Sequence, residues 1–132
     1  GGSLGKALYL KVEHIMGNRT APLVDIDADV KEVIVEIGAK MVGATAVMNQ
    51  GKLCGVVTDG DLRRMLSNTS DLSTLKARDV MSENPKQIDS NILASEALKI
   101  MHQNSISQLL VTTNGSYSGI IHLHDLLNEG LY

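Results

Sequence analysis

The chain contains the stretch Gly55-Val56-Val57-Thr58-Asp59-Gly60-Asp61-Leu62, in which a β-branched run leads directly into a helix start. A second copy follows as Gly119-Ile120-Ile121-His122-Leu123-His124-Asp125-Leu126, and Asp125 lies 64 residues after Asp61. Residues of one type also recur at this offset without a gap: Asp25 with Asp89, Glu32 with Glu96, Val47 with Val111, and Gly51 with Gly115. The sequence therefore predicts two copies of one structural unit.

The repeated stretch combines a helix cap with a carboxylate. Thr58 and Asp61 fit a capping box, and the free N–H groups of such a helix start form a site for an anion such as phosphate. The aspartate can also accept hydrogen bonds from two hydroxyls of a ribose. We therefore expect these positions to bind the sugar and phosphate of a nucleotide. The alternative is a capping box without a ligand, and the recurrence of the aspartate in the second copy argues against it.

The amino-acid composition argues against nucleic acid and membranes as partners. The formal charge of −3 is distributed along the chain, and the sequence lacks the basic surface and the aromatic platforms with which proteins bind nucleic acid. No apolar run is long enough to span a membrane, and no leader peptide is recognisable. We therefore expect a soluble protein that binds neither nucleic acid nor a membrane.

The aliphatic content predicts how the core is built. At 132 residues the chain suits one domain, which the repeat would divide into two interlocked halves rather than two independent cores. With no Trp and no Phe, that core must consist of aliphatic residues and Met. Cys54 is the sole cysteine, so no internal disulfide can form; we expect a small core residue and a cytoplasmic location.

The periodicity predicts an α/β fold in which the order strand, helix, hairpin, helix occurs twice. In the first half we expect strands at 23–26, 44–48 and 53–58, a helix from Asp27 or Asp29 to about Met41, and a helix at 59–68. In the second half we expect strands at 87–89, 107–112 and 117–122, and helices at 91–104 and from 123. Gly51 and Gly115 stand where hairpin turns require a positive φ. The result is two three-stranded sheets that can pack against each other.

Helical spacing also predicts which side chains face the core. Residues at this spacing give the first helix one apolar face, formed by Val30, Val33, Ile34, Ile37 and Met41. In the helix at 59–68 the inward residues should be Leu62, Met65 and Leu66. His14 and His102 are expected at the surface.

Twin units that end in Gly, two apolar residues and Thr-x-x-Asp resemble a tandem pair of cystathionine-β-synthase (CBS) domains, also called a Bateman module. The resemblance covers residues 12 to about 130, with one repeat at 12–68, a linker at 69–76 and a second repeat at 77–130. The strings Thr58-Asp-Gly-Asp-Leu-Arg-Arg64 and His122-Leu-His-Asp-Leu-Leu127 are similar to the regulatory region of arabinose 5-phosphate isomerases. Residues 1–11 then resemble the end of the sugar-isomerase (SIS) domain that precedes the CBS pair in that family. The resemblance implies that the catalytic domain is missing and that the parent protein makes a precursor of the sugar acid Kdo, for lipopolysaccharide or capsule.

The resemblance also implies a ligand, since CBS pairs hold a nucleotide in the cleft between their repeats. By position, Asp61 and Asp125 would bind ribose hydroxyls, Thr58 and His122 would face phosphate, and the base would rest near Val42 and Ile106. His122 stands where the general pattern has Thr or Ser. A His is expected in the isomerase subfamily, whose ligand would be a cytidine sugar nucleotide such as CMP-Kdo; otherwise AMP or ATP is the expected ligand.

Three alternatives compete with a nucleotide sensor: a metal site, an enzyme and a structural module. His122 and His124 do not have the convergent spacing of a metal site, and no Cys or third His is near them in the sequence. A free-standing enzyme would need a nucleophile paired with a base, which the sequence does not offer. A structural dimerisation module without a ligand remains open. In either open case, the helix faces around Leu62, Met65, Leu66, Leu126 and Leu127 are expected to form a homodimer.

Overall fold

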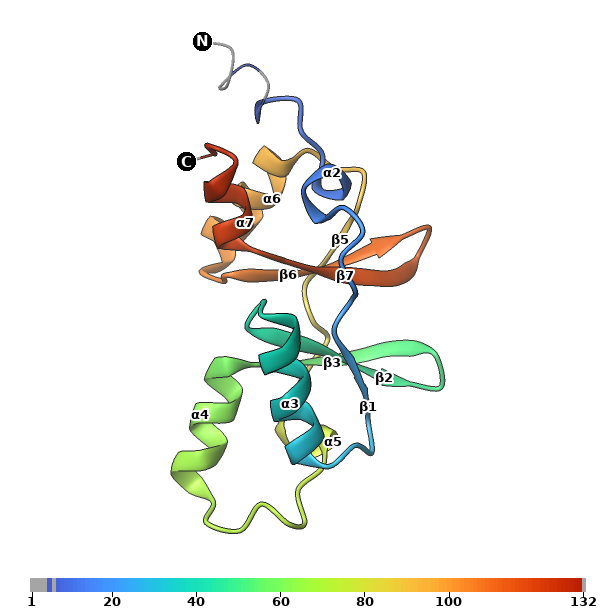
Figure 1. Cartoon of the computed structure of the whole chain (residues 1–132), viewed down its shortest axis with the longest axis vertical. Coiled ribbons are helices and arrows are strands. Elements are labelled where there is room, and N and C mark those ends of the chain that lie inside the picture. The colour runs from blue at the N-terminus through green and yellow to red at the C-terminus, as the bar shows by residue number, and fades with distance from the viewer. Residues whose placement is uncertain (1–4, 6, 132) are drawn as a thin grey trace. The chain divides into compact units, whose positions relative to one another are not determined.

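The computed structural model describes residue 5 and residues 7–131, which fold as an α/β protein with two small mixed sheets (Figure 1). The chain divides into two compact units. One unit consists of residues 21–85, and the other combines residues 1–20 with residues 86–132.

The 21–85 unit is built on a four-stranded sheet in the order β1-β2-β3-β4. Its elements are β1 (Leu23–Asp25), α3 (Val30–Lys40), β2 (Ala44–Asn49), β3 (Lys52–Thr58), α4 (Asp59–Asn68), α5 (Ala77–Val80) and β4 (Ser82–Glu83). β1 and β2 are parallel and α3 connects them, whereas β2 and β3 form an antiparallel hairpin. The fourth strand, β4, was not predicted from the sequence, so the expectation of a three-stranded sheet is wrong for this unit.

The other unit repeats this plan with three strands in the order β5-β6-β7. Its elements are α2 (Val12–Met16), β5 (Gln87–Asp89), α6 (Ala94–Asn104), β6 (Gln108–Thr113), β7 (Ser116–His122) and α7 (Leu123–Asn128). The hairpin glycines have positive φ as predicted, at 79° for Gly51 and 81° for Gly115. α6 begins three residues later than predicted, because the carbonyls of Ser90 and Ile92 accept hydrogen bonds from the N–H groups of Glu13 and Val12 in α2.

The two short helices α2 and α5 change places relative to the sequence repeats. α2 opens the first repeat but packs in the unit that contains the second, where Val12 is fully buried in the core. α5 opens the second repeat and packs in the 21–85 unit, where Ala77 is fully buried. We call α2 and α5 the exchanged helices. Each unit has a hydrophobic core of its own, so the halves interlock as predicted, but the expectation that they lack separate cores is wrong.

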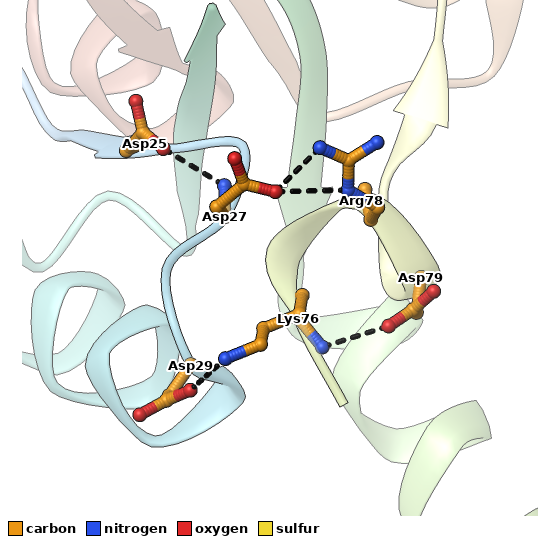
Figure 2. A network of polar contacts seen from close by, with 6 residues as sticks. All are labelled: Asp25, Asp27, Asp29, Lys76, Arg78 and Asp79. Atoms are coloured by element: carbon orange, nitrogen blue, oxygen red, sulfur yellow. Dashed lines mark hydrogen bonds and ion pairs between the residues drawn. The ribbon is translucent and has the colours of Figure 1, made fainter. Parts of the chain in front are cut away.

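Equivalent backbone hydrogen bonds hold the exchanged helices. The N–H of Ala77 donates to the carbonyl of Ala28 at 2.9 Å, and the N–H of Val12 donates to that of Ile92 at 3.0 Å. Around α5, Figure 2 shows charged side chains that reinforce this contact: Lys76 reaches Asp29 at 2.6 Å, and Arg78 is paired with Asp27. The segment from β1 to α3 is thereby held along the α5 segment by backbone and side chains together.

Most side chains predicted to face the core do so, but three do not. Ile34, Met41 and Leu66 are exposed, whereas Val30, Val33, Ile37, Leu62 and Met65 are buried. Met41 ends α3 in the left-handed conformation (φ 59°), which takes its side chain out of the helical face on which the prediction placed it. Ile34 and Leu66 lie at the edges of the buried faces of their helices. Among the described residues, no helix has the length and apolar character needed to cross a membrane.

Candidate functional site

The first candidate junction joins β3 to α4 in the 21–85 unit. Thr58 is the N-cap of α4, and its Oγ1 accepts a hydrogen bond from the Asp61 N–H at 3.2 Å. In return, Asp61 Oδ2 accepts from the Thr58 N–H at 2.9 Å. This reciprocal pair is the predicted capping box, and it fixes the aspartate side chain beside the amino end of the helix.

The Asp61 carboxylate has further partners. Its Oδ2 also accepts from the Thr58 hydroxyl at 3.1 Å, and its Oδ1 pairs with Arg64 Nη2 at 2.6 Å. The Arg64 side chain is 71% exposed and lies one helical turn further along the same helix. Water competes with Asp61 for the exposed Arg64 guanidinium, although the Asp61 side chain itself is only 10% exposed, so the ion pair contributes little free energy. Arg64 can therefore be replaced at Asp61 by another hydrogen-bond donor at low cost.

A shallow pocket of about 260 Å³ lies beside this junction, between α4 and the α5 segment. Its polar wall includes Asp61, Arg64 and Asp79, and Met65 and Val80 contribute apolar surface. The pocket offers both charges and a short apolar wall to a small polar ligand.

The second candidate junction joins β7 to α7. His122 takes the cap position, and its Nδ1 accepts a hydrogen bond from the His124 N–H at 2.9 Å. Asp125 Oδ2 accepts from the His122 N–H at 2.7 Å, as Asp61 does from Thr58. Because Nδ1 is an acceptor here, it carries no proton. A phosphate contact by His122, as the resemblance implied, would therefore have to use Nε2.

An arginine that the sequence did not single out holds the second carboxylate. Arg19 Nη1 donates to Asp125 Oδ1 at 3.0 Å, and Nη2 donates to Asp125 Oδ2 at 2.8 Å and to the Ile120 carbonyl at 2.7 Å. Side-chain exposure is 34% for Arg19 and 21% for Asp125. Arg19 precedes Asp125 by 106 residues and belongs to no repeated motif, so the sequence contains no spacing that could have revealed the pair.

This environment shifts the acidity of Asp125. Partial burial, the largest single influence, raises its pKa, but the Arg19 hydrogen bonds, the His122 N–H and the Arg19 charge outweigh that effect. The pKa of Asp125 is lowered as a result, and the carboxylate is held in its charged form.

The two residues predicted to support a base occupy equivalent places. Val42 is buried and Ile106 partly buried, and each follows a left-handed residue that ends a helix. The residue after each one is bonded to the adjacent junction: the Gly43 carbonyl accepts from the Asp59 N–H at 3.0 Å, and that of Ser107 accepts from the Leu123 N–H at 2.8 Å. Val42 is thus tied to the Thr58 junction and Ile106 to the His122 junction, each within one unit. Their contact with a base stays a prediction.

The cysteine and the remaining histidines show no arrangement typical of a reactive or metal-binding site among the described residues. The Cys54 thiol donates to the Val47 carbonyl at 3.2 Å, and Cys54 packs partly buried against the core. Burial is the main cause that raises the pKa of this thiol. Within the described part of the chain, no group of three or more His, Cys, Asp or Glu residues is arranged to hold a metal ion. His14 and His102 are exposed, as predicted.

Comparison with known protein families gives a match along nearly the whole sequence. The sequence model of the CBS domain family matches residues 12–68 and again residues 77–132. Two curated relatives are named arabinose 5-phosphate isomerase KdsD. The protein from Francisella tularensis is 42% identical over 96% of this chain and 39% of its own length, and that from Yersinia pestis is 37% identical over 99% of this chain and 40% of its own length. The chain thus spans about two fifths of the length of these relatives.

Solved structures give the same fold. A CBS-domain protein from Agrobacterium tumefaciens superposes with a TM-score of 0.82 at 20% identity, covering 94% of this chain and 96% of its own. A CBS domain protein from Pyrobaculum aerophilum, solved in complex with AMP, superposes with a TM-score of 0.77 at 17% identity, covering 88% of this chain and 89% of its own. At these identities the likeness concerns the fold alone.

Proposed function

This chain belongs to the CBS domain family, and on that premise we propose that it is the regulatory, nucleotide-sensing part of a sugar-phosphate isomerase. The whole protein would be an arabinose 5-phosphate isomerase of Kdo synthesis, for lipopolysaccharide or capsule, with its catalysis in an SIS domain outside this chain. The observation that carries the proposal is the 37% to 42% identity to two such isomerases, which extends over nearly the entire chain. The ligand would be an adenine nucleotide (AMP or ATP) or CMP-Kdo.

The Thr58 junction supports nucleotide binding by its chemistry. The amino end of α4 presents the positive end of its helix dipole to a phosphate. The Asp61 carboxylate can exchange its exposed Arg64 partner for ribose hydroxyls while it keeps its hydrogen bonds from Thr58. A protein of the same fold solved in complex with AMP supports this proposal.

A bound nucleotide would regulate the isomerase by linkage. It can shift the whole protein only if it binds two arrangements of that protein with different affinity. CMP-Kdo, as an end product of the proposed route, would then act as a feedback signal, and an adenine nucleotide would report the energy state of the cell.

Isothermal calorimetry of the 132-residue chain with AMP, ATP and CMP-Kdo tests the proposal. We expect one of the three to bind and Asp61→Asn to weaken that binding at least tenfold, because the amide cannot accept two hydroxyl protons with the strength of a carboxylate. Asp71→Asn is the matched control, since this exposed aspartate bonds only to Ser73 among the described residues. Binding of none of the three ligands would refute the proposal.

A second candidate function is a dimerisation module that binds no ligand. Leu66 on α4 is 53% exposed and Leu127 on α7 is 36% exposed, which leaves apolar side chains for a partner. The other residues of the predicted dimer faces, Leu62, Met65 and Leu126, are buried in the cores, so their assignment to a dimer interface is wrong. Light scattering of wild type and Leu66→Glu tests this function. A dimer that the substitution converts to a monomer, with unfolding temperatures that no nucleotide changes, would favour it.

A further inference from the structure

Asp61 and Asp125, the aspartates of the two junctions, differ in the cationic partners of their carboxylates. Asp61 has a single cationic partner, the exposed Arg64, through one oxygen. Asp125 has both of its oxygens bound by one guanidinium, and the same guanidinium is anchored to the Ile120 carbonyl of β7. We call Arg19, Asp125 and the Ile120 carbonyl the Arg19 clamp.

The Arg19 clamp already gives Asp125 the two hydrogen bonds that a ribose would donate to it. A ribose diol would donate two hydrogen bonds to a carboxylate, and Arg19 already donates two at 2.8 Å and 3.0 Å. Bonds from a guanidinium are charge-assisted and stronger than bonds from neutral hydroxyls. A diol that displaced Arg19 would also remove the guanidinium from the Ile120 carbonyl. Hydroxyls alone therefore do not replace the guanidinium at Asp125.

The 21–85 unit has no equivalent of this clamp among its described residues. At the offset that aligns Met16 with Met81, Arg19 aligns with Asn84, a left-handed residue (φ 54°) directly before Pro85. The cation at Asp61 comes instead from α4 itself, and its side chain is twice as exposed as that of Arg19 (71% against 34%). The two junctions have similar backbones and differ in how firmly a cation holds the carboxylate, although the Asp61 side chain is itself less exposed than that of Asp125 (10% against 21%).

We propose that Arg19 determines which junction accepts a ligand: it keeps Asp125 from ribose hydroxyls, so that the chain binds one nucleotide, through Asp61. This inference rests on the proposed function and specifies the regulation of its site. The second junction becomes a binding site only when Arg19 is withdrawn, and Arg19 is therefore a specificity-determining residue.

Calorimetry with AMP as the probe tests the clamp. For wild type we expect one site per chain, and for Arg19→Gln two, because glutamine cannot make the bidentate charged contact. The new site should be tighter than any residual binding at this junction in wild type by about 10- to 100-fold, the range for hydrogen bonds to charged groups. In the double variant Arg19→Gln/Asp125→Asn the count should return to one.

Amide NMR of the wild-type chain gives a second readout that needs no Arg19 variant to fold. On titration with AMP, we expect the signals of residues 58–61 to shift and those of residues 122–125 to stay in place. Two equal sites in wild type, or one site in a folded Arg19→Gln, would overturn the clamp while leaving the proposed nucleotide function intact. If the Arg19→Gln variant bound AMP and the wild type did not, Arg19 would be shown to block the second junction, and binding through Asp61 would be refuted. Absence of AMP binding from every variant would overturn the clamp, and would refute the proposed function as well if ATP and CMP-Kdo also failed to bind.

Discussion

The two compact units have the same backbone plan and fill it with different side chains. Three backbone hydrogen bonds around α5 have counterparts around α2. Around α5, the N–H groups of Val30, Ala77 and Arg78 donate to the carbonyls of Leu75, Ala28 and Ile26, respectively. Around α2, the N–H groups of Ala94, Val12 and Glu13 donate to the carbonyls of Leu10, Ile92 and Ser90 in the same order. Two ion pairs accompany this contact at α5, whereas among the described residues none joins α2 to residues 89–94. The comparison indicates that backbone bonds and apolar burial position the exchanged helices, and that the charges are additions to one copy.

The largest expected difference between the units concerns two equivalent leucines on the helices that follow their hairpins. Leu126 on α7 is fully buried and Leu62 on α4 is 9% exposed. Leu126→Ala should lower the free energy of unfolding by about 3 to 5 kcal/mol and Leu62→Ala by about 2 to 3 kcal/mol, since the cost rises with the cavity left behind. Urea unfolding measures both.

The exposed neighbour Leu127 provides the control for this pair. Leu127→Ala should cost less than about 1 kcal/mol, because little apolar area is lost from the interior. An equal loss for Leu62 and Leu126 would contradict the difference in burial between the two helices.

The second difference lies where each exchanged helix meets a glycine of the adjacent strand. A Cβ on Gly55 would lie 2.6 Å from Met81 Sδ and 3.0 Å from the Ser82 carbonyl oxygen, which belongs to the backbone of β4. A Cβ on Gly119 would overlap only the terminal methyl of Met16, which can rotate away. We expect Gly55→Ala to cost about 1 to 3 kcal/mol and Gly119→Ala less than about 1 kcal/mol. Thermal unfolding measures both changes.

Gly38 serves as the control for the glycine pair. It lies within α3, and nothing lies within 4 Å of its added Cβ. Gly38→Ala should therefore stabilise the chain by about 0.5 to 1 kcal/mol through helix propensity. If Gly119→Ala proved as costly as Gly55→Ala, the role assigned to the β4 backbone would be wrong.

The caps and hairpins of the two units could be predicted from sequence because their interactions are local. Thr58 and Asp61 bond to each other across three residues, and Gly51 adopts its positive φ within a two-residue turn. Whether Asp61 and Asp125 bind ribose is still a prediction, since it depends on a ligand. The repeat places His122 at the position of Thr58, but the sequence did not predict that its Nδ1 accepts a hydrogen bond from the His124 N–H.

Features that depend on distant residues could not be predicted. An offset of 65 residues, one more than that of the later elements, aligns α2 with α5, but helical periodicity does not say which sheet a five-residue helix joins. Arg19 meets Asp125 across 106 residues, and a single arginine in a loop gives no sign of its partner. Helical spacing located the buried faces of α3 and α4 but not their edges, so Leu66 was placed inside although it is exposed.

The third difference is the pH dependence that the Arg19 clamp gives to one unit. The pKa of Asp125 is lower in the folded chain than its ordinary value. Its contribution is therefore fully present above the pKa of the unfolded chain and is lost as the pH falls through the lower folded-state value. Arg19→Gln should remove about 1 to 2 kcal/mol at neutral pH, less than a fully buried pair would lose because both side chains retain exposure.

Unfolding temperatures between neutral and acidic pH measure this effect. The difference between wild type and Arg19→Gln should decrease towards acid, because protonated Asp125 no longer attracts the guanidinium. A constant difference across the whole range would show that Arg19 stabilises the chain through packing and not through its charge.

The smallest expected difference concerns the ion pairs around α5 (Figure 2). Hydrogen bonds and charge attraction from each partner raise the pKa of Lys76 and lower that of Asp29. Both side chains are nonetheless well exposed, at 43% and 57%, and salt screens such pairs strongly. Lys76→Met should therefore shift the unfolding temperature only slightly at low salt and not at all at high salt. Lys11→Met, at the equivalent place before α2, is the matched control, and we expect no salt-dependent change from it. A large loss for Lys76→Met alone that high salt abolishes would mean that the charges, and not the shared backbone bonds, hold α5 in its unit.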